Sequence, residues 1–113
     1  MITVHVESGI CGFNSVLRAH RIERKSVGIA IKSDCGQVAA FGDLLKKLNV
    51  DDVIRAPLNK NGVYEKAGKC NLHASCPVPC GVIKAAEVEL GLALMKDVRI
   101  AFQNDNQVAD DAT

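Results

Sequence analysis

Hydrophobic and polar residues alternate along the first third of the chain in separate stretches. In residues 2–6, isoleucine and valine alternate with polar residues. Residues 15–23 are rich in strand-forming types, and residues 26–32 alternate again. A period of two places every second side chain on the same face of a strand. The pattern therefore predicts a three-stranded antiparallel meander, with a glycine-containing turn after its first strand.

The hydrophobic spacing becomes helical further along the chain. Apolar residues at intervals of three and four run through residues 35–48, directly after a Ser-Asp pair that can cap a helix. Residues 49–69 show a mixed pattern with a proline and an Asn-Gly turn signal, which indicates a connector with a short helix over 63–67. A last helix is predicted to start at the Cys-Pro-Val-Pro segment and to end near Gly91.

The end of the chain adds one more predicted element. Residues 98–102 alternate again and predict a closing strand, whereas residues 103–113 are polar and acidic, which is typical of a flexible tail. The predicted fold is therefore α+β: a three-stranded antiparallel meander, then helices packed on one face of the sheet, and a closing strand. A chain of 113 residues has room for one hydrophobic core, so we expect a single domain over residues 1–102.

Composition and charge exclude several classes of function. The formal net charge is +1, without the basic excess that neutralises a phosphate backbone, and the chain has no Trp to stack on bases. No stretch approaches the roughly 20 apolar residues of a membrane span, and no basic leader precedes the first strand. We expect a cytoplasmic protein that binds neither nucleic acid nor membrane. A protein partner and the oligomeric state stay open.

Five cysteines are the main chemical feature of the sequence. Cytoplasmic thiols are kept reduced, so metal binding or redox chemistry is favoured over stable disulfides. Strands one and three of a meander run in the same direction, which places Cys11 and Cys35 at the same end of the sheet. Short connections would start the last helix at that end too, and Cys76 and Cys80 with it. The topology thus predicts that these four cysteines are neighbours.

Four thiolates would suit a zinc ion or an iron–sulfur cluster. Cys76 and Cys80 have the spacing C-x3-C, and they are the only close pair, so the sequence is not that of a zinc ribbon. A three-cysteine site is the alternative, and His73, three residues before Cys76, is a further candidate ligand. Cys70 lies in the connector, and we interpret it as a small core residue.

Several motifs in the sequence carry a resemblance to known proteins. They are Glu-Ser-Gly-Ile-Cys-Gly-Phe at 7–13, Ser-Asp-Cys at 33–35, and His-Ala-Ser-Cys-Pro-Val-Pro at 73–79, followed by Val-Glu-Leu-Gly-Leu-Ala-Leu at 88–94. With these motifs the chain resembles a family of short, uncharacterised cysteine-containing proteins from anaerobic prokaryotes, over nearly all of residues 2–102. The resemblance implies a signature set of Cys11, Cys35 and Cys76, and it implies no activity.

The segment around Cys76 is also similar, locally, to the sulfur-relay carriers of the TusA type. In those proteins a Cys-Pro-x-Pro segment opens a helix and its cysteine carries a persulfide. Here the segment comes late in the chain instead of after the first strand. A thiol at a helix N-terminus faces unpaired N–H groups, so we expect this position to lower the pKa of Cys76.

Three readings of function follow from these residues. The first is a metal or iron–sulfur binding module with Cys11, Cys35 and Cys76 as ligands and Cys80 or His73 as the fourth. The second is a thiol or persulfide protein in which Cys76 is the nucleophile, and whether the protein is an enzyme depends on this reading. The third is a structural or interaction domain with buried cysteines. Phosphate loops, dinucleotide-binding fingerprints and serine triads do not appear in the sequence.

Overall fold

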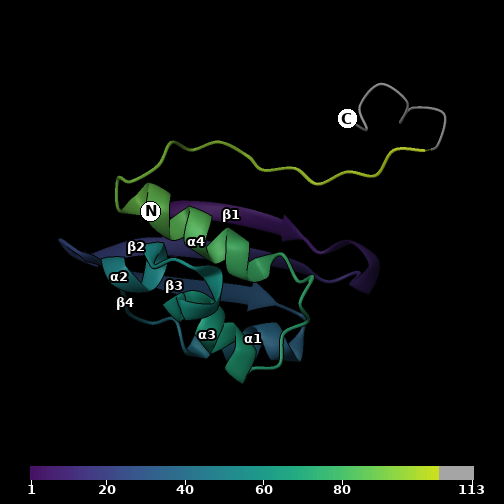
Figure 1. Ribbon diagram of the computed structural model, residues 1–113, viewed down its shortest axis with the longest axis horizontal. Coiled ribbons are helices and arrows are strands. Elements are labelled where there is room, and N and C mark those ends of the chain that lie inside the picture. The colour runs from purple at the N-terminus through teal and green to yellow at the C-terminus, as the bar shows by residue number, and fades with distance from the viewer. Residues whose placement is uncertain (105–113) are drawn as a thin grey trace.

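The computed structural model describes residues 1–104 and contains a sheet with helices on one side (Figure 1). The strands are β1 (Ile2–Glu7), β2 (Asn14–Glu23), β3 (Ser26–Ser33) and β4 (Leu48–Asn49). The helices are η1 (Gly9–Cys11), α1 (Gly36–Asp43), α2 (Val50–Ile54), η2 (Leu58–Lys60), α3 (Gly62–Lys69) and α4 (Val78–Glu89).

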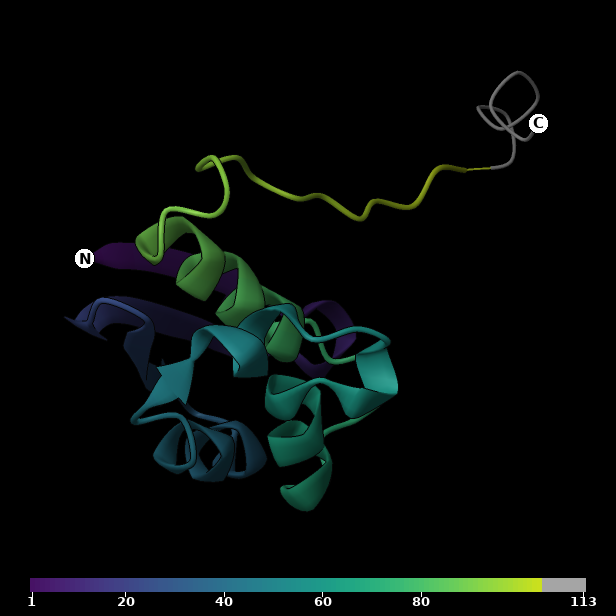
Figure 2. The ribbon, with the colours of Figure 1, turned by 60° about the vertical axis from the view of Figure 1, so that its left-hand side comes forward.

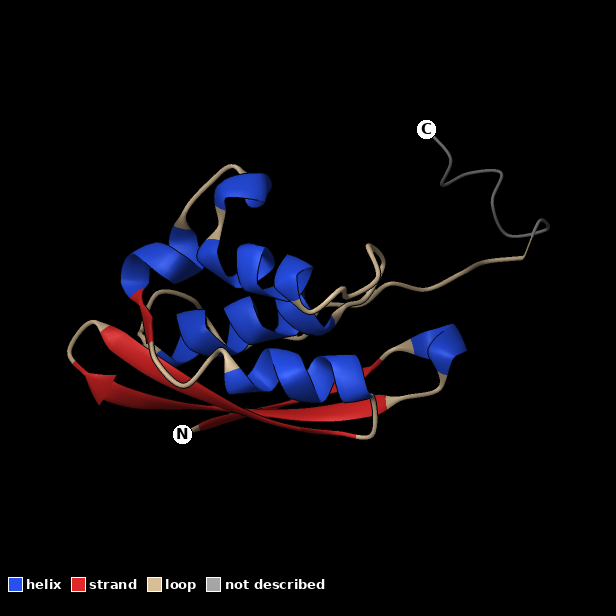
Figure 3. Ribbon diagram, turned by 90° about the horizontal axis from the view of Figure 1, so that it is seen from below, coloured by secondary structure: helices blue, strands red, loops and turns tan. Residues whose placement is uncertain are grey.

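The four strands form one antiparallel sheet in the order β1-β2-β3-β4. The predicted meander is confirmed: Val4 pairs with Leu17, which in turn pairs with Ile31. Because side chains alternate between faces along a strand, these three residues lie on the same face of the sheet. Figure 3 shows the helices packed on one face, as the α+β prediction requires.

The fourth strand is not the one that the alternation at residues 98–102 predicts. It is β4, which pairs with the start of β3. Residues 98–102 form no strand in the described part of the chain, because the backbone turns away from the sheet at Gly91, where φ is +76°, and the segment then meets no strand to pair with. Of the predicted tail, residues 105–113 lie outside the described part.

The first long helix is shorter than its hydrophobic spacing predicts. Helix α1 ends at Asp43 instead of near Leu48. The Leu45 carbonyl accepts a hydrogen bond of 2.9 Å from the N–H of Ile29 in β3, so it is unavailable to a continuing helix. Leu45 and Leu48 are nevertheless fully buried. The spacing therefore identified core residues correctly and their backbone conformation incorrectly.

The connector is built from two short helices that asparagine side chains cap. Asn49 and Asp52 form a capping box at the start of α2. Asn61 is 4% exposed; its side chain accepts hydrogen bonds from two N–H groups of α3 and donates one to the Val53 carbonyl at 2.9 Å. The helix expected over 63–67 is thus confirmed as α3.

The core lies between the sheet and its helices. Its largest fully buried members are residues of β2, β3, α1, α4 and their connections: Phe41, Leu17, Leu45, Leu48, Val27, Val53, Val63, Val78 and Val82. Helix α4 packs closely on β1 and β2, since a Cβ on Gly81 would come within 2.9 Å of Val6 and 3.0 Å of Leu17. This close approach fixes α4 on the sheet, and with it the chain just before the helix.

Gly28 in β3 has no room for a side chain. A Cβ there would lie 2.7 Å from the Lys46 carbonyl oxygen and 2.8 Å from the His20 ring. The backbone oxygen belongs to the segment that leads into β4 and cannot rotate away. We expect Gly28→Ala to lower the free energy of unfolding by about 1–3 kcal/mol, measured by urea denaturation.

The matched control is Gly68→Ala in α3, where an added Cβ meets nothing within 4 Å. Alanine is the better helix former, so this variant should keep the wild-type stability or gain up to about 1 kcal/mol. Equal stability of the Gly28 and Gly68 variants would contradict the close contact described for β3.

In the part of the chain that the structure describes, no helix is long and apolar enough to cross a membrane.

Candidate functional site

The sheet topology brings distant cysteines to one end of the molecule. Strands β1 and β3 run in the same direction because each is antiparallel to β2. Figure 1 shows their ends on the same side, together with the start of α4. The other end of α4 lies beside the start of β1, where the Met1 amino group and a Glu89 carboxylate oxygen are 3.4 Å apart.

Cys11 lies on the turn between β1 and β2 and is exposed. It is the last residue of η1, and glycines with φ near +77° stand close by on both sides: Gly9 at +78° and Gly12 at +76°. Few residue types other than glycine adopt such angles. The Gly12 N–H donates to the Gly9 carbonyl at 2.9 Å, which closes the turn and presents the thiol to solvent.

Cys35 follows β3 and is the N-cap residue of α1. Neither Ser33 nor Asp34 occupies the N-cap position, contrary to the sequence prediction. Instead the Ser33 hydroxyl accepts a hydrogen bond from the Cys35 N–H at 3.2 Å and another from the Ser15 hydroxyl at 2.9 Å. Ser15 is buried in β2, so this chain of hydrogen bonds connects the backbone of Cys35 to the sheet.

Cys76 lies immediately before α4, whose N-cap residue is Pro77. A turn closes behind it, because the Cys76 N–H donates to the His73 carbonyl at 3.0 Å. The side chain is partly buried and packs against the hydrophobic core, as does that of Cys35. The backbone N–H of Val78 donates a hydrogen bond to the thiol.

The pKa of Cys76 is raised above the ordinary value for a cysteine, chiefly by burial. The Val78 N–H works in the opposite direction, and the charges of Cys11 and Cys35 add to the rise. The expected lowering by the helix N-terminus is therefore wrong, since desolvation outweighs one backbone hydrogen bond. The charges of Cys11 and Cys35 therefore reach the Cys76 thiol.

Cys80 lies in α4, near Tyr64 of α3. It is the third residue of α4, and its charge acts on Tyr64 of α3. Burial first, and Cys80 second, raise the pKa of the Tyr64 hydroxyl. The sequence suggested no role for Tyr64, because a lone tyrosine in a connector gives no signal until the packing of α3 against α4 is known.

The two other candidate residues differ in their surroundings. Cys70 is the C-cap residue of α3 and packs against the core, as expected for a small core residue. His73 is exposed on the turn that precedes Cys76.

The thiols are neighbours without forming a ready ligand set. Among residues 1–104, no group of three or more His, Cys, Asp or Glu side chains is placed so that it could hold a metal ion. We name Cys11, Cys35 and Cys76 the thiol cluster. Its most exposed member is also the one on a short glycine turn.

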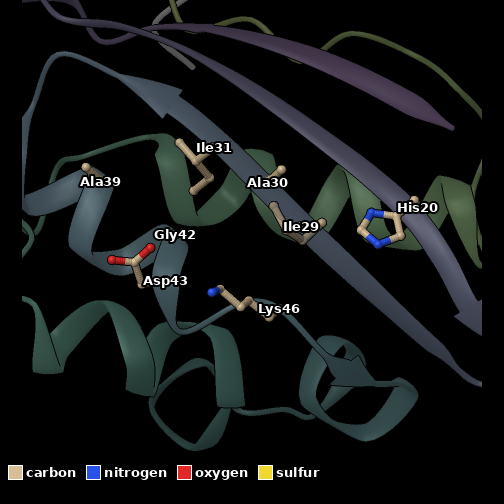
Figure 4. A pocket seen from close by; sticks show the side chains of 8 residues that line it. All are labelled: His20, Ile29, Ala30, Ile31, Ala39, Gly42, Asp43 and Lys46. Atoms are coloured by element: carbon tan, nitrogen blue, oxygen red, sulfur yellow. The ribbon is translucent and has the colours of Figure 1, made fainter.

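A surface hollow lies elsewhere, between β3 and α1. It has a volume of about 420 Å³, and its eight lining residues include His20, Asp43 and Lys46 but no cysteine (Figure 4). Most of the other lining side chains are aliphatic. The hollow is therefore separate from the thiol cluster, and its three polar residues form no hydrogen bond or ion pair among themselves that would organise a site.

Comparison with known proteins connects the chain to one family. No curated protein and no solved structure matches it. The model of a family of unknown function, DUF6951, matches residues 2–102, which include the whole sheet, all the helices and the thiol cluster. The chain therefore belongs to this family of unknown function.

Proposed function

We propose that the protein binds a soft metal ion or an iron–sulfur cluster through Cys11, Cys35 and Cys76. The observation that carries the proposal is the effect of two thiols on the third: the charges of Cys11 and Cys35 both oppose the ionisation of Cys76. The three residues come from three separate connections: the β1–β2 turn, the link from β3 to α1 and the link from α3 to α4.

Electrostatics explains why such a cluster favours a cation. Three thiolates close together repel one another, so in the absence of a counter-charge they keep their protons. A bound cation reverses this effect, because it stabilises each thiolate and releases the protons. Thiolates are soft ligands that suit Zn²⁺, Cu⁺ and iron–sulfur clusters. A thiol cluster in which the charges of two members oppose the ionisation of the third is therefore suited to a soft cation.

Geometry indicates how the ligands would come together. Cys35 and Cys76 pack against the core, and Cys35 is also tied to the sheet through Ser33. Cys11 lies on the exposed η1 turn, and no side chain caps this short helix by a hydrogen bond. Binding would draw this turn towards the two anchored thiols. The fourth ligand would be Cys80, His73 or a group from outside the protein.

The thiol or persulfide reading of Cys76 has less support. A nucleophilic cysteine reacts as the thiolate, and burial raises the pKa of Cys76. Cys76 is partly buried and lies before the N-cap residue of α4, instead of within the first turn of the helix. The metal reading needs no lowered pKa in the metal-free protein.

Metal analysis of single cysteine variants tests the proposal. Protein purified without oxygen, or reconstituted with Zn²⁺ or with iron and sulfide, should contain metal in a fixed ratio to protein. We expect Cys11→Ser, Cys35→Ser and Cys76→Ser each to lower that ratio by more than about half, because each removes one of few ligands. The measurement is elemental analysis together with acid-labile sulfide.

Cys70→Ser is the matched control, since it changes a partly buried cysteine outside the thiol cluster. Its metal content should equal that of the wild type. Cys80→Ser and His73→Ala identify the fourth ligand by the same assay. Equal losses in the Cys70 and Cys35 variants, or a wild-type protein that takes up neither metal nor cluster, would refute the proposal.

A further inference from the structure

The segment after α4 is apolar, extended and exposed. Its large hydrophobic residues are exposed by half or more: Leu92 52%, Leu94 89%, Met95 76%, Val98 61%, Ile100 89% and Phe102 103%. In residues 98–102 they alternate with Arg99 and Ala101. Figure 2 shows the segment standing clear of the sheet and helices. A strand-like segment with one apolar face is thus presented to solvent, and such faces commonly mark interaction sites.

Strand β1 forms an edge of the sheet that can accept another strand. Strand β1 lies at the end of the order β1-β2-β3-β4 and pairs only with β2. Every second residue of an edge strand turns its N–H and C=O groups outwards, where an added strand can bond to them. Along β1, Val4 and Val6 lie towards the helices, and Glu7 is exposed.

The direction of the segment indicates which copy of β1 it meets. Helix α4 returns the chain to the start of β1, so the segment leaves in the same direction as β1 (Figures 1 and 2). On its own β1 it could add only as a parallel strand. In a two-fold symmetric pair with the axis perpendicular to the strands, the β1 of the second copy runs the opposite way. The segment can then add to the β1 of the second copy as an antiparallel strand.

The antiparallel register is supported by both faces of the strand. Placing Arg99 opposite Glu7 pairs two exposed residues of opposite charge. The same register places Ile100 opposite Val6 and Phe102 opposite Val4, so the apolar face of β1 continues into the segment. A parallel addition to β1 that sets residue 98 opposite residue 2 would place Arg99 opposite Thr3, and Arg99 would no longer face Glu7.

We propose that residues 98–102 of one copy add to the β1 edge of a second copy, in a reciprocal strand exchange that makes a homodimer. The β1 edge of each copy is therefore occupied by residues 98–102 of the other copy. Each exchanged segment covers its own apolar face and forms hydrogen bonds with the open edge of one β1 strand. A symmetric pair contains two such exchanges.

The oligomeric state of the full chain tests the exchange. We expect a dimer by light scattering after size exclusion, at about 100 μM and with reductant present to prevent disulfides between copies. Ile100→Lys places a charge in the apolar face and should weaken dimerisation at least about tenfold. Leu58→Lys is the matched control: Leu58 is 62% exposed on η2, away from the exchange, and its variant should remain a dimer.

Exchange of the two charges tests the register. Glu7→Arg and Arg99→Glu should each weaken the dimer, and the double variant should regain most of the affinity. A monomeric wild type would overturn the proposal, including a monomer whose residues 98–102 resist hydrogen exchange because they pair with their own β1. A dimer that Ile100→Lys leaves intact would overturn it too, and a double variant no better than the single ones would rule out this register.

Discussion

Cys11 in the metal-loaded protein is expected to react with iodoacetamide at least about tenfold more slowly than in the same protein after chelation, because a thiolate bound to metal no longer attacks. Cys11 is the best reporter of the thiol cluster, since it is the exposed member of the three. The measurement is mass spectrometry of each cysteine-containing peptide at timed intervals, without oxygen.

Cys76 provides an internal comparison in the same experiment. Burial and its neighbours raise its pKa, so in chelated protein near pH 7.5 it should react more slowly than Cys11. Its rate should increase with pH until the pH passes the raised pKa. Fast alkylation of Cys11 in protein that still holds its metal would show that Cys11 is not a ligand. Fast alkylation of Cys76 near neutral pH would restore the sulfur-carrier reading.

Replacement of Phe41 by alanine is expected to lower the free energy of unfolding by about 3–5 kcal/mol, a large part of what holds a small domain folded. Phe41 is fully buried in α1 and is the largest side chain of the core. Its removal deletes apolar contacts and leaves a cavity that the surrounding helices and sheet fill only in part. Urea denaturation followed by circular dichroism measures the loss.

The two other phenylalanines are matched controls for the same substitution. Phe13 is 41% exposed and Phe102 fully exposed. Phe13→Ala should cost far less than Phe41→Ala. Phe102→Ala should leave the unfolding of a protomer unchanged while it weakens the proposed dimer. Equal losses at all three positions would contradict the burial described for the core.

The sheet could be predicted because its pattern is local. Alternation in the first 33 residues specifies both the strands and their buried faces, and hairpin connections leave little choice of order. The helical spacing over residues 35–48 was less decisive. Leucines at positions 45 and 48 fit a helix as well as they fit the extended path into β4. The hydrogen bond from Ile29 to Leu45 and the pairing of Leu48 with Val27 distinguish the two.

The segment at 98–102 shows what a pattern leaves undetermined. Alternating apolar residues indicate that one face of the strand must be buried, but they do not identify the surface that buries it. A strand needs a partner for its backbone groups, and within the described residues this segment has no strand beside it. The prediction of a strand there was wrong for the single chain, and its physical basis is the same one that supports exchange between two copies.

The sequence could predict where the candidate site lies in the fold, but it could not predict the burial and contacts of its side chains. Strand direction alone placed Cys11, Cys35 and Cys76 at one end of the sheet, and their electrostatic interaction shows them together. The orientation of Cys80 towards Tyr64 depends on how α3 packs against α4, which no spacing reveals. The pKa of Cys76 depends on burial, which the motif around a helix start does not encode. That these residues bind metal stays a prediction.

The outermost strands, β1 and β4, differ in the length of backbone that they offer to a further strand. At two residues, β4 offers an incoming strand almost no ladder, whereas β1 offers six. Proteins whose sheets are open at both edges can add copies without end and grow into fibres. In the proposed pair, reciprocal exchange would use the β1 edge of both copies. Growth through this edge would therefore stop at the pair, and the exchange would give closed dimers instead of filaments.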